Sequence, residues 1–225
     1  MHATTTLCAY CGERLGDTDD HVPPKTIFPK PNAPHLLRVP ACSICHGGTS
    51  DDDEYFRDTL VKHHRVADAP QAQAQVEKML RAAANPKKTK YLGKTVASLT
   101  EVWVRTPAGI DLGTAPAIRV DLPRIARVLR RSVRGLSYLE TGSRLASDIR
   151  VEPTIEANVP DRMIHEFART FRTATPKMIE PGVFWYARGT PTDNDRVSAW
   201  LLVFFEAVTA FAITAPEDSP RWNDL

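Results

Sequence analysis

The chain has 225 residues, of which 42% are hydrophobic, 25% charged and 8% aromatic. These values are near the averages of globular proteins, and they exclude a disordered or collagen-like chain. The net charge is only +2, so any basic binding surface must come from local groups of Lys and Arg rather than from a globally basic chain. The length predicts a small N-terminal module and one larger body.

The N-terminus has no basic segment followed by an apolar core, so we find no secretory signal there. The most apolar stretch, residues 197–214, has Glu206 at its centre, where a charge would be costly inside a bilayer. Its many Val, Phe, Trp and Thr residues favour two consecutive buried strands over a membrane helix. We therefore expect a cytoplasmic protein with no membrane partner.

All four cysteines lie near the N-terminus as two Cys-x2-Cys pairs, Cys8 with Cys11 and Cys42 with Cys45. When each pair sits on a tight turn, the four thiolates occupy the corners of a tetrahedron around Zn²⁺, and a small module needs such a cross-link. The alternatives are two disulfides, which need an oxidising compartment, and a thioredoxin-like redox pair, which needs a helix in a βαβ pattern. The spacing therefore predicts a structural zinc site with four cysteine ligands.

Three further residues stand next to this predicted zinc site. Asp20 and His21 lie between the two cysteine pairs, and His46 follows the last cysteine directly. Taken singly, such residues are common in solvated loops. A zinc ion that binds both cysteine pairs would bring the three side chains close together, so the arrangement can support a second, catalytic metal ion.

The segments Cys8-x2-Cys11, Asp20-His21-Val-Pro-Pro-Lys25 and Val39-Pro-x-Cys42-x2-Cys45-His46 resemble the zinc-containing HNH endonucleases, over residues 7–58. The resemblance implies a ββα-metal fold, in which a β-hairpin carries the catalytic His and a helix carries metal ligands. It also implies Asp20 as a metal ligand, His21 as the general base and His46 as a further ligand. Alternatively, His46 does not bind the metal and lies next to the ligands or in solvent.

The resemblance leaves the remaining metal ligand open. In some members of the family this ligand follows the position of His46 by about one helical turn, which points to Ser50 or to one of the carboxylates of Asp51, Asp52 and Asp53. Asp51 is our first choice, because a carboxylate suits a hard cation.

The sequence departs from the family at the Asn that normally orients the base. His35 stands at that spacing, and a neutral imidazole can still donate a ring N–H. Asn32 is the alternative if the loop around it is shifted.

These residues imply metal-assisted hydrolysis of a phosphodiester bond, in which neutral His21 takes a proton from the attacking water. The ion, Mg²⁺ with Mn²⁺ or Ni²⁺ as substitutes, would bind Asp20 and His46 and stabilise the leaving oxygen. We therefore expect a metal-dependent endonuclease, with DNA as the first choice of substrate, in restriction, phage defence or a mobile element. The alternatives are a zinc-dependent module that binds nucleic acid without cleaving it, and a nuclease subunit that is active only with a partner protein.

After the cysteines, residues 51–61 begin with acidic side chains and continue with apolar ones, which predicts a helix that closes the module. Residues 68–84 predict a second helix. The basic run that follows is a solvated linker or a nucleic-acid contact, and it contains Lys87, Lys88, Lys90 and Lys94. We therefore divide the chain into an HNH module over residues 1–62, a helical and basic linker over 63–94 and an α+β domain over 95–225.

The last part of the chain predicts strands over residues 96–99, 101–105, 110–112, 183–187, 198–205 and 207–213. Helices are expected over residues 121–136, with Asp121 as the N-cap, and over residues 160–173. The predicted fold class is therefore α+β, with a mixed second domain that has antiparallel strands. We expect this domain to contact substrate, a partner protein or a second copy in a homodimer.

The helix predicted over residues 121–136 has one apolar face and one arginine face. Arginines on an exposed face can follow a phosphate backbone, and the alternative is an ordinary amphipathic surface helix. From this face we expect Arg127, Arg131 and Arg134 to contact nucleic acid, together with Lys25 from the module. The other arginines of the face are Arg124 and Arg130.

Overall fold

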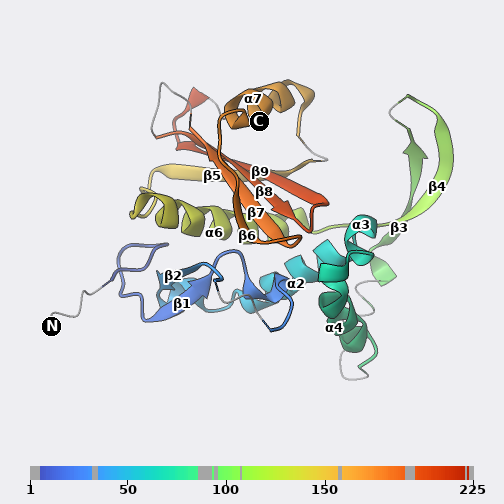
Figure 1. Ribbon diagram of the computed structural model, residues 1–225, viewed down its shortest axis with the longest axis horizontal. Coiled ribbons are helices and arrows are strands. Elements are labelled where there is room, and N and C mark those ends of the chain that lie inside the picture. Colours follow the sequence, from blue (N-terminus) through green and yellow to red (C-terminus); the bar gives the residue numbers. More distant parts are fainter. Residues whose placement is uncertain are drawn as a thin grey trace.

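The chain folds into a mixed α+β structure whose sheets are all antiparallel (Figure 1), so the predicted fold class is confirmed at this level. The computed structural model describes residues 6–31, 35–85, 93, 96–106, 108–156, 159–190, 196–220 and 222. Asn32, the alternative residue for orienting the base His21, and the basic residues Lys87, Lys88, Lys90 and Lys94 lie outside these ranges.

A small hairpin and two helices form the N-terminal part. Strands β1 (Thr18–His21) and β2 (Arg38–Ala41) pair with His21 opposite Arg38. The 3-10 turn η1 (Lys25–Ile27) lies in the loop between them, and α1 (Ser43–His46) and α2 (Ser50–Val61) follow β2. The predicted helix over 51–61 is confirmed, and its acidic first turn complements the helix dipole.

The segment after α2 is more broken than the single helix predicted over 68–84. It consists of α3 (His64–Ala67), the 3-10 turn η2 (Pro70–Ala72) and α4 (Gln73–Ala83). Pro70 starts η2, and because proline has no backbone N–H it begins a helical turn but cannot continue a preceding one. The α-helix therefore starts only at Gln73.

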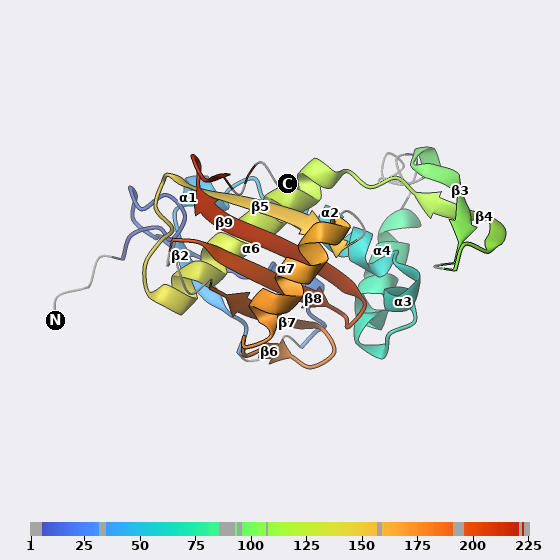
Figure 2. The ribbon, with the colours of Figure 1, turned by 90° about the horizontal axis from the view of Figure 1, so that it is seen from above.

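Strands β3 (Leu99–Arg105) and β4 (Asp111–Ile118) form a separate two-stranded hairpin that extends away from the other sheets (Figure 2). Both strands are largely exposed, and Trp103 has a relative exposure of 75%. The predicted strands over 101–105 and 110–112 belong to this hairpin.

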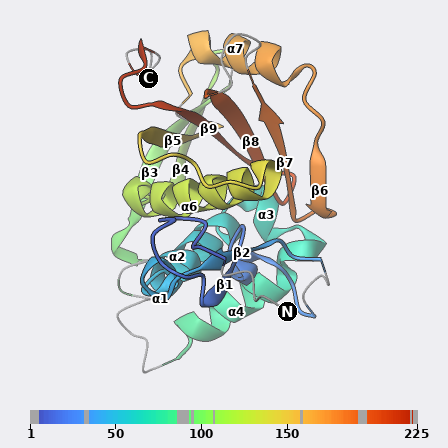
Figure 3. The same cartoon turned by 90° about the vertical axis from the view of Figure 1, so that its left-hand side faces the viewer.

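The largest sheet has the strand order β5-β9-β8-β7-β6. Helix α6 (Leu122–Thr141) covers one face of this sheet and α7 (Asp161–Phe171) covers the other (Figure 3). Both helices were predicted, and Asp121 caps α6 by accepting a hydrogen bond from the backbone N–H of Arg124. The strands are β5 (Ile149–Ile155), β6 (Lys177–Glu180), β7 (Phe184–Gly189), β8 (Ser198–Phe204) and β9 (Val208–Pro216).

The two outer strands, β5 and β6, were not predicted. Strand β5 contains Pro153, which cannot donate to a ladder and is tolerated because β5 is at the sheet edge. The apolar stretch 197–214 forms β8 and β9, as predicted, and Phe205 and Glu206 make the turn between them with positive φ angles of 52° and 53°. None of the helices that the structure describes is long and apolar enough to cross a membrane.

One cluster of buried residues joins the N-terminal hairpin, α2, α6 and the large sheet. The ring of Phe56 on α2 meets the ring of Phe204 on β8 edge-on, with centroids 5.2 Å apart. On the other side of the same cluster, α6 approaches the hairpin loop at Gly135, where an added Cβ would lie 2.5 Å from a methyl group of Val22. The position of α6 relative to the hairpin is therefore set by close packing.

Candidate metal centres

The four cysteines form one cluster, as the spacing predicts. Their sulfur atoms all lie within 4.8 Å of one another, and the Sγ atoms of Cys11 and Cys42 are 4.0 Å apart. Four sulfurs bound to one Zn²⁺ at about 2.3 Å would be separated by roughly 3.8 Å, so the geometry is compatible with a zinc site. All four cysteines are free, so the alternative of two disulfides is not what the structure has.

Backbone N–H groups and burial shift the pKa values of three of these thiols. The backbone N–H groups of Glu13 and Arg14 lower the pKa of Cys11 to about 6, and the N–H of Cys45 lowers the pKa of Cys42. Burial and the neighbouring sulfurs raise the pKa of Cys45. Cys45 can therefore ionise beside the neighbouring sulfurs only when a cation offsets the repulsion between them.

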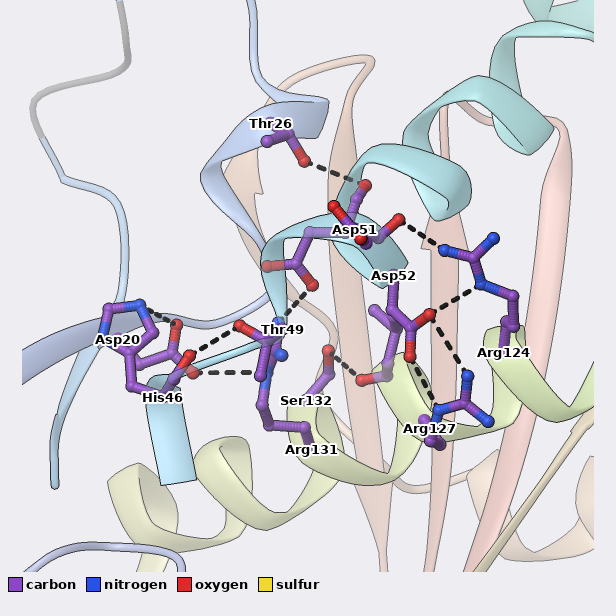
Figure 4. Close-up of polar contacts among 12 residues, drawn as sticks. Asp20, Thr26, His46, Thr49, Asp51, Asp52, Arg124, Arg127, Arg131 and Ser132 are labelled. Carbon is purple, nitrogen blue, oxygen red and sulfur yellow. Dashed lines mark hydrogen bonds and ion pairs between the residues drawn. The ribbon is translucent and has the colours of Figure 1, made fainter. Parts of the chain in front are cut away.

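The carboxylate of Asp20 is the centre of a second group of side chains. Asp20 lies on β1, is only 4% exposed and points between the hairpin and α6 (Figure 4). Its Oδ2 atom accepts a hydrogen bond of 2.7 Å from the phenol of Tyr10 and lies 3.3 Å from Nε of Arg131. Burial and the charge of Asp20 raise the pKa of Tyr10, so the phenol keeps its proton and donates it to the carboxylate.

The other oxygen of Asp20 faces His46. Its Oδ1 atom lies 3.6 Å from Nε2 of His46, which is too long for a hydrogen bond. Of the three residues predicted to lie together, Asp20 and His46 are therefore found side by side, although they come from β1 and α1.

The hydroxyl of Thr18 decides which nitrogen of His46 carries the proton. Thr18 donates its one hydrogen to the backbone oxygen of Ala41 at 2.9 Å, and its Oγ1 lies 3.1 Å from Nδ1 of His46. Because the hydroxyl proton is already used, Thr18 must accept from an Nδ1–H group. In neutral His46 the lone pair is then on Nε2, which faces the lone pairs of Asp20 Oδ1.

This pair of atoms fits a divalent ion. Bonds from an ion to a carboxylate oxygen and an imidazole nitrogen are each about 2.0–2.2 Å, so one ion can bridge the 3.6 Å between Asp20 Oδ1 and His46 Nε2. An N–H···acceptor contact from the far nitrogen, as His46 makes to Thr18, is the usual support for a metal-binding His. The fit covers two ligands, and water or substrate would complete the shell.

The three aspartates considered for the remaining ligand have different surroundings. Asp51 is exposed, and Asp52 is held by Arg124 and Arg127, each at 2.7 Å. Asp53 is half-buried and forms an ion pair with Arg131, the same arginine that contacts Asp20. Asp53, rather than the predicted first choice Asp51, therefore shares an arginine with Asp20.

His21, the predicted base, follows Asp20 on β1 and is half-buried. Burial lowers its pKa first, and the charges of Arg38 and Lys25 lower it further, so the imidazole is neutral at physiological pH. Within the described ranges, no hydrogen bond or ion pair joins His21 to Asp20 or His46.

The predicted partner of His21 is not in contact with it. His35 is exposed in the loop that precedes β2, and the described residues include no hydrogen bond between His35 and His21. Two cations do lie near the base, Lys25 on η1 and the cross-strand neighbour Arg38.

The arginine face of α6 is engaged within the chain rather than free. Arg127 pairs with Asp52, Arg131 with Asp20 and Asp53, and Arg134 donates to the backbone oxygen of Ile149 at 3.2 Å. Contacts of Arg127, Arg131 and Arg134 with nucleic acid therefore stay a prediction that would require these bonds to be exchanged. The two remaining arginines of the face are also bonded, Arg124 to Asp52 and Arg130 to Glu152.

Several residues of the site were not predicted from the sequence. Tyr10 and Thr18 hold Asp20 and His46 in place, and Arg38 lies beside His21. Nothing in their local pattern distinguishes them from ordinary turn and strand residues.

Comparison of the chain with protein-family models, with curated proteins and with solved structures found no match.

Proposed function

We propose that the chain is a metal-dependent endonuclease of the HNH type, which hydrolyses phosphodiester bonds of nucleic acid, with DNA as the first choice. The observation that carries the proposal is the distance of 3.6 Å between Oδ1 of Asp20 and Nε2 of His46. Asp20 lies on a β-hairpin, and His46 lies on the helix that follows it. This arrangement agrees with the ββα-metal fold that the sequence resemblance implies. The bound divalent ion would neutralise charge on the phosphate and on the leaving oxygen.

The residues of the chain have distinct roles in this proposal. Asp20 and His46 bind the ion, and Thr18 keeps Nε2 of His46 free for it. His21 is the general base, because its low pKa keeps it neutral and able to take a proton from water. The charges of Lys25 and Arg38 both act on His21, and in this proposal the two cations attract the phosphate of the substrate.

The four-cysteine cluster has a separate role. We propose that it binds one structural Zn²⁺, which ties the turn before β1 to α1 and so fixes the distance between Asp20 and His46. A zinc ion with four thiolate ligands has no open position, so it cannot take part in hydrolysis. The protein would therefore use two metal ions with different jobs.

A zinc-dependent binding module that does not cleave is the second candidate. It is favoured by one observation, the absence of any hydrogen bond from the described residues that would orient His21. A nuclease that needs a partner to orient the base would have the same appearance, so the activity must be tested with the chain alone.

The test is nicking of supercoiled plasmid by the full chain with Mg²⁺ or Mn²⁺. We expect His21→Ala to remove the activity while zinc content and Mn²⁺ binding stay unchanged, and Asp20→Asn to remove both activity and Mn²⁺ binding. His165→Ala is the matched control, because His165 is exposed on α7, on the far face of the sheet. Cleavage by the His21→Ala protein would contradict the role of the base, and nucleic-acid binding without cleavage would favour the second candidate.

A further inference from the structure

Arg131 links the two halves of the chain at the site around Asp20. It lies on α6, and its side chain is only 12% exposed. Its Nε lies 3.3 Å from Oδ2 of Asp20 on β1, and its Nη2 forms an ion pair with Oδ1 of Asp53 on α2. Figure 4 shows Arg131 reaching from α6 toward the side of the hairpin where Asp20 and His46 lie.

The two carboxylates are held differently. Asp20 Oδ2 has a second donor in Tyr10, so Asp20 stays oriented without Arg131, and its Oδ1 remains directed at His46. Asp53 has Arg131 as the one ion-pair partner of its side chain within the described residues. Loss of the Arg131 contact would therefore leave Asp20 in place and release Asp53.

The charges of the site show that Arg131 occupies a place that another cation could take. With neutral His46, the two carboxylates and Arg131 leave one net negative charge, whereas without Arg131 there would be two.

Asp53 does not yet lie with Asp20 and His46 as a ligand set. Within the described residues, the four cysteines are the group of His, Cys, Asp and Glu side chains close enough to share a metal ion. Asp53 would have to turn away from Arg131 to join Asp20 and His46. Arg131 contacts the carboxylates of both Asp20 and Asp53, so the two carboxylates are separated by the width of one guanidinium group.

We propose that Arg131 and the divalent ion compete for Asp53, so that Asp53 becomes the third protein ligand when the ion displaces the guanidinium. The inference rests on the proposed metal site at Asp20 and His46. It makes α6 part of the catalytic centre, and it makes the ion bind more weakly than the carboxylates alone would allow.

The test is calorimetric titration of Mn²⁺ into the zinc-loaded full chain. We expect Arg131→Met to bind Mn²⁺ at least tenfold more tightly than the wild type, because a competing cation is gone and a carboxylate is freed. In the Asp53→Asn background the same substitution should gain less than threefold, since no carboxylate is released. Arg127→Met is the matched control: it removes an arginine that pairs with Asp52 from the same helix, and it should leave the Mn²⁺ affinity within twofold.

Two outcomes separate this inference from the proposed function. If Asp20→Asn abolishes Mn²⁺ binding but Arg131→Met binds no tighter than the wild type, the competition is wrong and the metal site stands. If the wild type binds no Mn²⁺, or if Asp20→Asn has no effect on binding, the metal site and the competition are both wrong. Arg131→Lys covers the case in which the Met variant does not fold, because lysine keeps the packing and cannot bridge both carboxylates, so it should also bind Mn²⁺ more tightly.

Discussion

Thr18 accepts a hydrogen bond from Nδ1 of His46, since the hydroxyl of Thr18 already donates to Ala41. This relationship determines that Nε2 of His46 faces Asp20 with a lone pair rather than with a proton. We predict that Thr18→Val, which keeps the shape and removes the acceptor, weakens Mn²⁺ binding by about 10–100-fold. Calorimetric titration measures the change.

The control for this prediction is Thr59→Val. Thr59 is half-buried on α2, and its hydroxyl donates to the backbone oxygen of Tyr55, away from Asp20. The Thr59→Val protein should bind Mn²⁺ as the wild type does. Equal affinities of the Thr18→Val and wild-type proteins would show that the tautomer of His46 is not set by Thr18.

The pKa of His21 predicts how activity depends on pH. Burial, Arg38 and Lys25 lower this pKa below about 6.5, so kcat/KM should fall only when the pH drops below that range. Because the folded chain binds this proton less well than the unfolded chain, the contribution of His21 to stability rises with pH between the folded pKa and about 6.5. NMR titration of the His21 ring gives the folded pKa directly.

Arg38→Ala tests the cause of this shift. Removal of the nearby positive charge should raise the pKa of His21 and move the acid limb of the kcat/KM profile to higher pH. Arg105→Ala, which removes an exposed arginine of the β3–β4 hairpin, should leave the His21 titration unchanged. A His21 pKa that is the same in the Arg38→Ala protein and in the wild type would exclude the electrostatic part of the explanation.

Gly135 is predicted to be essential for the packing of α6 against the hairpin loop. A Cβ at this position would lie 2.5 Å from a methyl group of Val22, so Gly135→Ala should lower the free energy of unfolding by about 1–3 kcal/mol in urea denaturation. In the Val22→Ala background the same substitution should be neutral or stabilising, because the space is free and Ala is favoured over Gly in a helix by about 1 kcal/mol. A stabilising effect in the wild-type background would mean that α6 does not approach the loop this closely.

The two proposed metal ions should respond differently to metal-free buffer. Exhaustive dialysis against metal-free buffer should stop cleavage and leave one zinc per chain, because four-thiolate zinc sites bind with about 10–16 kcal/mol in small peptides. Mg²⁺ alone should then restore cleavage. Cys45→Ser should lower the zinc content and the Tm of the whole chain, because the hairpin and the large sheet share one cluster of buried residues. Metal analysis that finds no zinc in the purified wild type would refute the structural site.

Part of this structure follows from local sequence. The two Cys-x2-Cys pairs predict a cluster of four sulfurs, because the turn around each pair needs only a few neighbouring residues, such as Gly12 with its φ of +66°. The helices over Ser50–Val61, Leu122–Thr141 and Asp161–Phe171 follow from their apolar period and, for α6, from the Asp121 cap. The edge strands β5 and β6 escaped prediction, since short strands with proline or few apolar residues have no clear period.

The sequence by itself therefore determined the cysteine cluster, the α+β class and the proximity of Asp20 to His46. The cluster and the proximity depend on residues next to the predicted zinc site, and the class depends on the local periodicity of apolar residues. Only the tertiary structure decided which aspartate of α2 shares an arginine with Asp20, and which arginine that is. Successive helix residues are rotated by about 100°, so the orientation of α2 places Asp53, rather than Asp51, toward Arg131. That orientation comes from the packing of α2 and α6 in the shared cluster of buried residues, a contact between distant segments that no local pattern encodes.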